Sequence, residues 1–170
     1  PKEPEQIYRL AQLPVDGPLL DVGGGTGRVA QYMRAKASQV VIADLSLDML
    51  QQAAIKPGLQ TVCSTGEQLP FDGNFFDCVL IVDALHHVFD QETTAAEMWR
   101  VLKPGGRLII EEPDVRKFGV KLIALAEKLA LMRSHFLSPP QIVALFDAYP
   151  AKTQIVLDGI IAWVVVEKIS

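Results

Sequence analysis

Apolar and polar residues alternate along this 170-residue chain in a regular pattern. Short runs rich in Val, Ile and Leu recur, and between them lie longer segments whose apolar residues follow helical spacing. Runs that are apolar throughout predict strands buried on both faces, because a strand with one solvated face alternates polar and apolar positions. The pattern therefore predicts an α/β fold with a mainly parallel sheet between two layers of helices. The predicted strands lie at residues 19–22, 40–43, 59–63, 77–82 and 107–111.

Helical spacing and capping residues predict the connecting segments. Ser46 and Asp90 are good N-caps for helices that reach residues 55 and 102. The second helix must end at the Lys-Pro-Gly-Gly sequence 103–106, because proline cannot continue a helix and glycine turns freely. Ser138 followed by Pro139 is a typical capped start for a later helix. The predicted helices cover residues 4–13, 27–36, 46–55, 90–102, 117–133 and 138–148.

The pattern changes near the end of the chain. Residues 154–157 and 160–166 are two β-rich runs separated by Asp158-Gly159, a dipeptide that readily adopts the positive φ angles of a tight hairpin. The last two strands are therefore expected to be antiparallel. Because no repeat, low-complexity tract or linker divides the sequence, residues 1–170 are expected to form a single domain.

Composition narrows the class of protein. The longest apolar runs, such as residues 160–166, are far shorter than the ~20 residues of a membrane-spanning helix, so we expect a cytoplasmic protein without a membrane span. Cys63 and Cys78 lie in apolar stretches without metal-ligand spacing, which predicts buried thiols and no metal site. A net charge of −4 gives no general attraction to polyanions, so nucleic acid is a disfavoured partner.

The strongest chemical signal is the sequence Leu-Leu-Asp-Val-Gly-Gly-Gly-Thr-Gly at residues 19–27, where a predicted strand runs into glycines. Glycines there allow a tight turn and let a ligand approach the free backbone N–H groups. A merely structural turn rarely needs four glycines in five positions. The candidate cofactor-binding residues of this loop are Asp21, Gly23, Gly24, Gly25, Thr26 and Gly27.

Asp44 ends the second predicted strand, 17 positions after Gly27. A carboxylate there can accept hydrogen bonds from both hydroxyls of a ribose, which predicts an adenosine-containing ligand, although Asp44 could also cap the next helix. NAD is one candidate, because Gly25-x-Gly27-x-x-Ala30 fits a loose dinucleotide fingerprint. The short chain, Asp21 ahead of the glycines and the predicted hairpin favour a methyl donor instead.

Several further motifs follow in order along the chain, and together with the glycine loop they resemble the class I S-adenosylmethionine-dependent methyltransferases. The resemblance is strongest to the branch of ubiquinone and menaquinone C-methyltransferases. The matching pieces are Asp21 to Gly27, Ala43-Asp44-Leu45-Ser46, Met49-Leu50, Glu67-x-Leu69-Pro70-Phe71, Phe76-Asp77, Leu85-His86-His87-Val88 and Leu102-Lys103-Pro104-Gly105-Gly106. The resemblance implies a Rossmann-like, doubly wound sheet of seven strands in the order 3-2-1-4-5-7-6, with strand seven antiparallel, in a three-layer sandwich.

The resemblance also implies roles for individual residues. Asp21 and the glycine loop would hold the methionine part of S-adenosylmethionine, and Asp44 would accept the ribose hydroxyls. Leu45 and Met49 would flank the adenine. The cofactor-binding segment implied after the third strand is Thr65-Gly66-Glu67.

Two positions of this cofactor site need separate comment. Thr65 stands where the family usually has an aspartate that accepts from the adenine amino group, and a neutral acceptor is weaker than a carboxylate. Asp83 stands where the family places a main-chain carbonyl facing the cofactor's amino group.

Methyl transfer from a sulfonium mainly requires placement of an acceptor, so no fixed catalytic base is predicted. If the acceptor must lose a proton, His87 is the candidate base, since it follows the fourth strand and imidazole is the usual general base of enzymes near neutral pH. A capping or packing role for His87 remains the alternative, and His135 is a weaker candidate.

A small-molecule acceptor, of apolar character, is the expected partner, and the protein is expected to be a monomer or homodimer. The segment 115–138 carries an apolar stripe, which is interpreted either as a lid over such an acceptor or as core or dimer packing. The stripe consists of Phe118, Leu122, Leu125, Leu129 and Met132. A cofactor-binding interaction protein or inactive paralogue is a second possible function, and an NAD-binding oxidoreductase a third.

Overall fold

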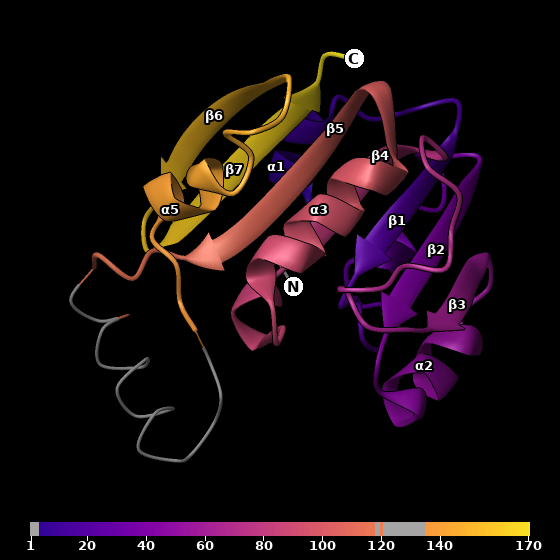
Figure 1. Cartoon of the computed structure of the whole chain (residues 1–170). Helices are drawn as coiled ribbons and strands as arrows, with labels where there is room; N and C mark the ends of the chain where they lie inside the picture. The colour runs from indigo at the N-terminus through magenta and orange to yellow at the C-terminus, as the bar shows by residue number, and fades with distance from the viewer. Residues whose placement is uncertain (1–3, 118–119, 121–134) are drawn as a thin grey trace.

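The computed structural model describes residues 4–117, 120 and 135–170, and a seven-stranded sheet runs through them (Figure 1). Its strands are β1 (Pro18–Val22), β2 (Gln39–Asp44), β3 (Leu59–Cys63), β4 (Phe76–Val82), β5 (Leu102–Pro113), β6 (Ala151–Asp158) and β7 (Ile161–Lys168). Their order is β3-β2-β1-β4-β5-β7-β6. The strands β1 to β5 pair in parallel, whereas β7 is antiparallel to both β5 and β6. The predicted order and the C-terminal hairpin are both confirmed.

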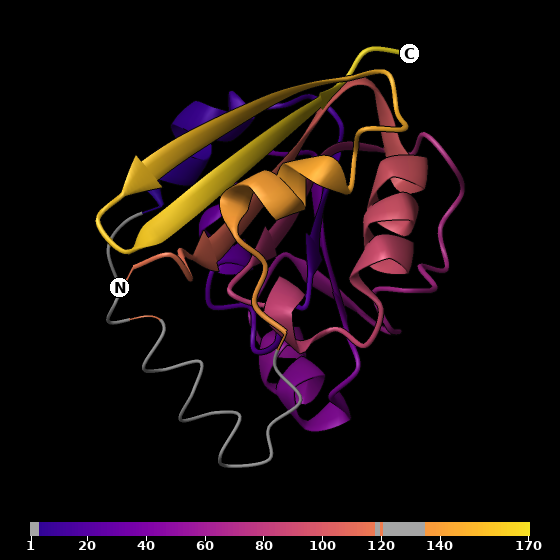
Figure 2. The same cartoon turned by 60° about the vertical axis from the view of Figure 1, so that its left-hand side comes forward.

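Helices cover the two faces of this sheet, as Figure 2 shows from a second direction. They are α1 (Glu5–Ala11), α2 (Leu47–Ala54), α3 (Gln91–Val101) and α5 (Pro139–Ala144), with 3₁₀ turns η1 (Ala30–Tyr32) and η2 (Leu85–His87). The predicted caps are in place, since Ser46 accepts from the Met49 N–H and Asp90 from the Thr93 N–H. The helix expected at 117–133 and its apolar stripe lie outside the described residues, apart from positions 117 and 120.

The helix predicted for residues 27–36 is wrong. This segment forms consecutive tight turns and only the short η1, held by i to i+3 hydrogen bonds such as Met33 N–H to Ala30 O. Side chains occupy carbonyls that an α-helix would use: the Gln31 amide donates to Arg28 O, and Arg34 Nε donates to Gln31 O. Side-chain donors of this kind compete with the helical ladder for the same acceptors.

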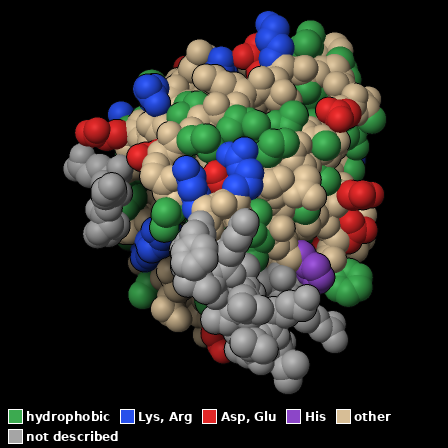
Figure 3. Space-filling model, turned by 90° about the vertical axis from the view of Figure 1, so that its left-hand side faces the viewer, with side chains coloured by type: hydrophobic (Ala, Val, Ile, Leu, Met, Phe, Trp, Pro, Cys, Tyr) green, Lys and Arg blue, Asp and Glu red, His purple; other side chains and the backbone are tan. Residues whose placement is uncertain are grey.

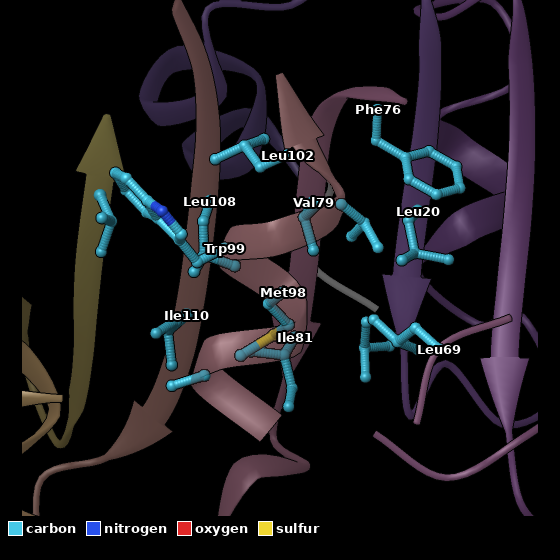
Figure 4. Close-up of a cluster of buried hydrophobic side chains, with 14 of the residues drawn as sticks. Leu20, Leu69, Phe76, Val79, Ile81, Met98, Trp99, Leu102, Leu108 and Ile110 are labelled. Atoms are coloured by element: carbon cyan, nitrogen blue, oxygen red, sulfur yellow. The ribbon is translucent and has the colours of Figure 1, made fainter. Parts of the chain in front are cut away.

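The core is divided by the sheet into two layers, because neighbouring residues of a strand face opposite sides. On one side α3 and α5 pack on residues of the central strands, as Figure 4 shows for Met98, Ile81 and Ile110. On the other side α1, η1 and α2 pack on the intervening residues of the same strands, including Leu80 and Ile109. The carboxyl ends of the strands, beyond these two layers, are therefore where a ligand can approach the sheet.

The hairpin side of the molecule is less completely covered. The strand β6 pairs only with β7, and the apolar side chains of Ile155 and Leu157 on it are exposed. Figure 3 faces this side and shows hydrophobic side chains gathered across it, with lysine and arginine side chains among them. This strand is therefore an open edge of the sheet in the described chain.

The two cysteines differ in environment. Cys78, in the central strand β4, is buried as predicted, but Cys63 is exposed. The expectation for Cys63 was wrong because β3 is the outermost strand on its side of the sheet, and Cys63 is the last residue of that strand. None of the helices in the described residues has the length and apolar character that crossing a membrane requires.

Candidate functional site

The glycine loop lies where the carboxyl ends of β1, β2 and β4 meet. Gly23, Gly25 and Gly27 all have positive φ angles, between 53° and 73°, which side chains with a Cβ rarely adopt. Gly24 has an ordinary φ, but a Cβ there would lie 2.7 Å from the Asp21 carboxylate. The loop therefore needs glycine at each of these positions, for backbone conformation or for space.

Two cavities adjoin this loop and share Gly23, Met49 and Asp83 in their linings. The first cavity, of about 440 Å³, extends from β2 towards the segment after β4. Of the predicted site residues, its lining includes Asp44, Leu45, Met49, Thr65, Gly66, Glu67, Asp83 and His87. The second cavity, of about 210 Å³, includes Asp21, Gly23, Gly24, Gly25 and Thr26. The fold thus brings together nearly all of the residues that the sequence singled out.

Gly27 is the exception, because it lines neither cavity. A Cβ on Gly27 would lie 2.8 Å from Leu59 Cδ1 and 2.9 Å from Ile42 Cδ1, inside the core layer. Its glycine is therefore required for packing of the loop against β2 and β3 rather than for ligand contact.

Asp21 is the most unusual residue of the site. It is 1% exposed, and neither carboxylate oxygen has a well-formed hydrogen bond to the described residues. Burial raises its pKa to about 7, with Arg28 opposing and Asp44 adding to the rise, and only a weak contribution from the Ala30 backbone N–H favours its charged form. A buried carboxylate without a partner is costly to a fold, so this one is available to a ligand that brings a donor.

Asp44 organises the backbone around the first cavity. Its Oδ2 accepts from the Gly25 N–H at 2.8 Å, and its Oδ1 accepts from the Ser46 N–H at 2.8 Å. Ser46 is itself the N-cap of α2, so the Ser46 bond forms a turn just before the helix and Asp44 is not its cap. Each carboxylate oxygen can accept a second hydrogen bond, so Asp44 keeps acceptor capacity towards the cavity.

The remaining lining residues of the first cavity have mixed character. The side chains of Leu45 and Met49 are 69% and 46% exposed, although both are large and apolar. Glu67 turns its carboxylate to the backbone, because Oε1 accepts from the N–H groups of Phe89 and Asp90. Phe89 itself is 87% exposed and lines the cavity, a feature that the sequence interpretation missed. Large apolar side chains exposed beside a cavity are typical of ligand contact surfaces.

Asp83 and His87 follow β4 at the rim. Asp83 has a φ of 54°, rare for a residue with a Cβ, and its N–H donates to Glu111 O at 2.9 Å. His87 is exposed to the first cavity, and its ring lies 3.9 Å, centre to centre, from the ring of His86.

The neighbouring His86 makes a contact that the sequence did not predict. Its Nδ1 lies 2.6 Å from Glu112 Oε2, and the other oxygen of Glu112 accepts from the Leu85 N–H at 2.7 Å. Both side chains are buried, and the ring of Phe136 stacks on His86. Glu111 and Glu112 are neighbours on β5 and point to opposite faces of the sheet, and Glu112 is a buried tether between β5 and η2.

Comparison with known proteins agrees with this architecture. A family model described as a methyltransferase domain matches residues 20–110, more than half of the chain. The chain therefore belongs to the class I S-adenosylmethionine-dependent methyltransferase family. S-adenosylmethionine is the cofactor of this family.

Individual relatives and structures are similar over different lengths. The ubiquinone/menaquinone biosynthesis C-methyltransferase of Vibrio cholerae is 36% identical over 104 residues, covering 55% of this chain and 40% of that protein. The chain thus spans less than half the length of such relatives. An S-adenosylmethionine-dependent methyltransferase structure from Thermotoga maritima superposes with a TM-score of 0.78 at 20% identity, over 96% of this chain and 93% of that one. The structure of a methyltransferase of the same cofactor class from Aquifex aeolicus superposes with a TM-score of 0.78 at 17% identity, over 96% of this chain and 88% of that one.

The sheet order also separates this chain from dinucleotide-binding oxidoreductases. Their doubly wound sheet has the order 3-2-1-4-5-6. Here the antiparallel β7 lies between β5 and β6. The loose dinucleotide fingerprint at Gly25 to Ala30 is therefore set in a methyltransferase sheet.

Proposed function

We propose that this chain binds S-adenosylmethionine across the first and second cavities and transfers its methyl group to a small-molecule acceptor. The observation that carries the proposal is Asp21, a buried carboxylate that lines a glycine-walled cavity and has no well-formed hydrogen bond to the described residues. A methionine ammonium supplies the positive charge and the N–H donors that this carboxylate needs.

The other lining residues fit the remaining parts of the same cofactor. Arg28 lines the second cavity and interacts electrostatically with Asp21, so it can pair with the methionine carboxylate. Asp44 has the acceptor capacity for ribose hydroxyls, and the exposed apolar surfaces of Leu45 and Met49 suit an adenine ring. Thr65 offers a hydroxyl at the adenine end, a weaker acceptor than a carboxylate.

The cofactor supplies an activated methyl group, so the chain's main tasks are to bind, to orient and to exclude water. For an acceptor that enters the first cavity, His87 is the exposed side chain that can accept its proton. The Vibrio cholerae relative is a ubiquinone/menaquinone biosynthesis C-methyltransferase, which supports an acceptor of apolar character.

Calorimetric titration with S-adenosylmethionine, S-adenosylhomocysteine and NAD tests the proposal. Asp44→Ala removes acceptors for the ribose and for the Gly25 N–H, and it should weaken binding of both sulfur cofactors by about 1.5 to 3 kcal/mol. Asp44→Asn keeps the size of the side chain, so its binding of both sulfur cofactors should be weakened less than that of Asp44→Ala. The control is Asp48→Ala, an exposed helical residue outside both linings, which should bind like the unmodified protein.

The outcomes separate the alternatives. Binding of both sulfur cofactors, without NAD binding and with the Asp44 effect, supports the cofactor site. If neither sulfur cofactor binds, the proposed function is wrong. Cofactor binding by a protein that transfers methyl to no acceptor would favour the second candidate, a cofactor-binding interaction protein, which the neutral Thr65 permits.

A further inference from the structure

A third cavity, of about 440 Å³, lies beside the proposed cofactor site, and no role has yet been assigned to it. We propose that this cavity binds the methyl acceptor, that the acceptor is a small amine with an apolar body, and that Glu111 takes up the proton of its nitrogen. The proposal rests on the cofactor assignment made above.

The strand register places the acidic and aromatic residues of this cavity on one row. Val82 of β4 pairs with Glu111 of β5, and Glu111 pairs with Trp163 of β7. Residues directly opposite each other on neighbouring strands turn their side chains to the same face. All three line the third cavity, on the face of the sheet that α1 covers.

The third cavity adjoins the second, which contains the glycine loop. Arg28, Val29 and Val82 line both. Asp83, which lines the first and second cavities, donates its N–H to Glu111 O, so Glu111 lies one strand away from the cofactor site. An acceptor held beside Glu111 is therefore next to the space proposed for the methyl donor.

The charges around the third cavity favour a cation. Its lining includes the carboxylates of Glu111 and Asp158, with Arg28 as the basic side chain of the lining. Burial raises the pKa of Glu111 to about 7, and repulsion from Asp83 adds to the rise, whereas Arg28 opposes it. An ammonium group at this position would relieve the repulsion between Glu111 and Asp83, and an anionic acceptor would increase it.

The rest of the lining suits an apolar body. Ile7 from α1 and Ile160 and Ile161 from the hairpin form its walls. Trp163 adds an aromatic surface, and its indole Nε1 has no hydrogen-bond partner among the described residues although the residue is only 7% exposed. Aromatic surfaces attract ammonium groups as well as apolar ones.

In the proposed reaction, proton transfer to Glu111 precedes methyl transfer to the nitrogen. The amine enters as an ammonium ion, and the Glu111 carboxylate takes one of its protons, which frees the nitrogen lone pair. The nitrogen–carbon bond to the methyl group then forms as the carbon–sulfur bond breaks, and sulfur keeps the electron pair. The methylated product leaves as an ammonium ion, and Glu111 releases its proton to water. A carboxyl pKa near 7 brings Glu111 closer to an amine in basicity and makes it a better proton acceptor.

Binding of three matched probes tests the proposal, with S-adenosylhomocysteine present throughout. The probes are 2-phenylethylamine, 2-phenylethanol and phenylacetate, which share a ring and differ in charge. The readout is the indole N–H resonance of Trp163, with Trp99, the other tryptophan of the chain, as internal control because it packs on the opposite face.

We expect the amine to shift the Trp163 resonance saturably, to leave Trp99 unmoved and to bind at least tenfold more tightly than the alcohol, with phenylacetate weakest. Glu111→Gln should lower amine affinity at least tenfold and leave S-adenosylhomocysteine affinity unchanged. The control variant Glu92→Gln, exposed at the start of α3, should change neither.

An amine that binds no more tightly than the alcohol, or that leaves Trp163 unmoved, overturns the proposal without any variant having to fold. Equal amine affinity in Glu111→Gln overturns the role of Glu111. If S-adenosylhomocysteine itself does not bind, the proposed function has failed. If it binds while the amine preference is absent, only the present inference has failed.

Discussion

Asp21 is a residue whose burial opposes the stability of the fold at neutral pH and whose carboxylate we propose to bind the cofactor. Its pKa rises from 3.8 to about 7 on folding, so the native state holds a proton more tightly than the unfolded state does. Stability attributable to Asp21 is therefore lost as pH rises from about 4 to 7. We predict that Asp21→Asn raises the free energy of unfolding at pH 8, by up to about 4 kcal/mol, and by less at pH 5. Urea unfolding at both pH values measures this.

The same substitution should weaken S-adenosylhomocysteine binding, because an amide lacks the charge that attracts an ammonium group. Asp16→Asn, at an exposed position, is the control and should change neither quantity. A variant that is less stable at pH 8 would show that Asp21 has a partner in solution.

Two glycines allow the cost of a positive φ angle to be measured separately from the cost of a steric clash. Gly27 and Gly105 both have positive φ, 73° and 79°, but a Cβ at Gly105 would meet nothing within 4 Å. We predict that Gly105→Ala lowers the free energy of unfolding by about 1 to 2 kcal/mol, because of backbone conformation alone. Gly27→Ala should cost about 1 to 3 kcal/mol more, since its Cβ would press on Leu59 and Ile42. Thermal and urea unfolding measure the difference, and equal costs would contradict the packing role of Gly27.

At the scale of elements, Glu112 tethers η2 to β5 through His86 and the Leu85 N–H. We predict that Glu112→Ala lowers the free energy of unfolding by about 3 to 5 kcal/mol, because it leaves a buried imidazole and a buried N–H without their acceptor. Glu112→Gln keeps an acceptor oxygen, so it should lower the free energy of unfolding by less. Urea unfolding is the measurement, with Glu92→Ala as the exposed control. A loss below 1 kcal/mol for Glu112→Ala would mean that the tether is dispensable.

The elements also show which parts of the fold the sequence could predict. Strands buried on both faces were predicted because their apolar runs are continuous, and the helices after Ser46 and Asp90 because their caps are local. The segment 27–36 was mispredicted, since its turns depend on side-chain bonds to carbonyls: Arg34 donates to Gln31 O within the segment and to Pro57 O outside it. Long-range contacts of this kind leave no periodic signal.

For the whole molecule, the first two cavities were predictable and the third was not. The residues of the first two follow strands β1, β2, β3 and β4, and the ends of parallel strands meet at one edge. The third cavity combines α1, β5 and the hairpin, and the hairpin reaches it because β7 pairs with β5. The sequence alone does not link Glu111 to Trp163, whereas the register of β5 and β7 places the two residues opposite each other.

This arrangement predicts that two ligands protect different parts of the molecule from hydrogen exchange. S-adenosylhomocysteine should slow exchange in the segments that line its proposed site, at residues 23–29, 44–49, 64–67 and 83–89. Added 2-phenylethylamine should extend the slowing to α1 and to residues 158–161, which line only the third cavity. Some amides exchange only when the ligand site opens. A ligand at 100 times its Kd can raise the free energy of that opening by about 2.7 kcal/mol.

The edge strand β6 is the internal control for this measurement, because residues 151–156 line none of the three cavities. Their exchange should respond to either ligand only as far as they open with the whole sheet. Protection of residues 158–161 by S-adenosylhomocysteine alone would mean that the third cavity belongs to the cofactor. Amine protection confined to residues 83–89 would place the acceptor beside His87 instead of Glu111, so the pattern decides between the two candidate proton acceptors.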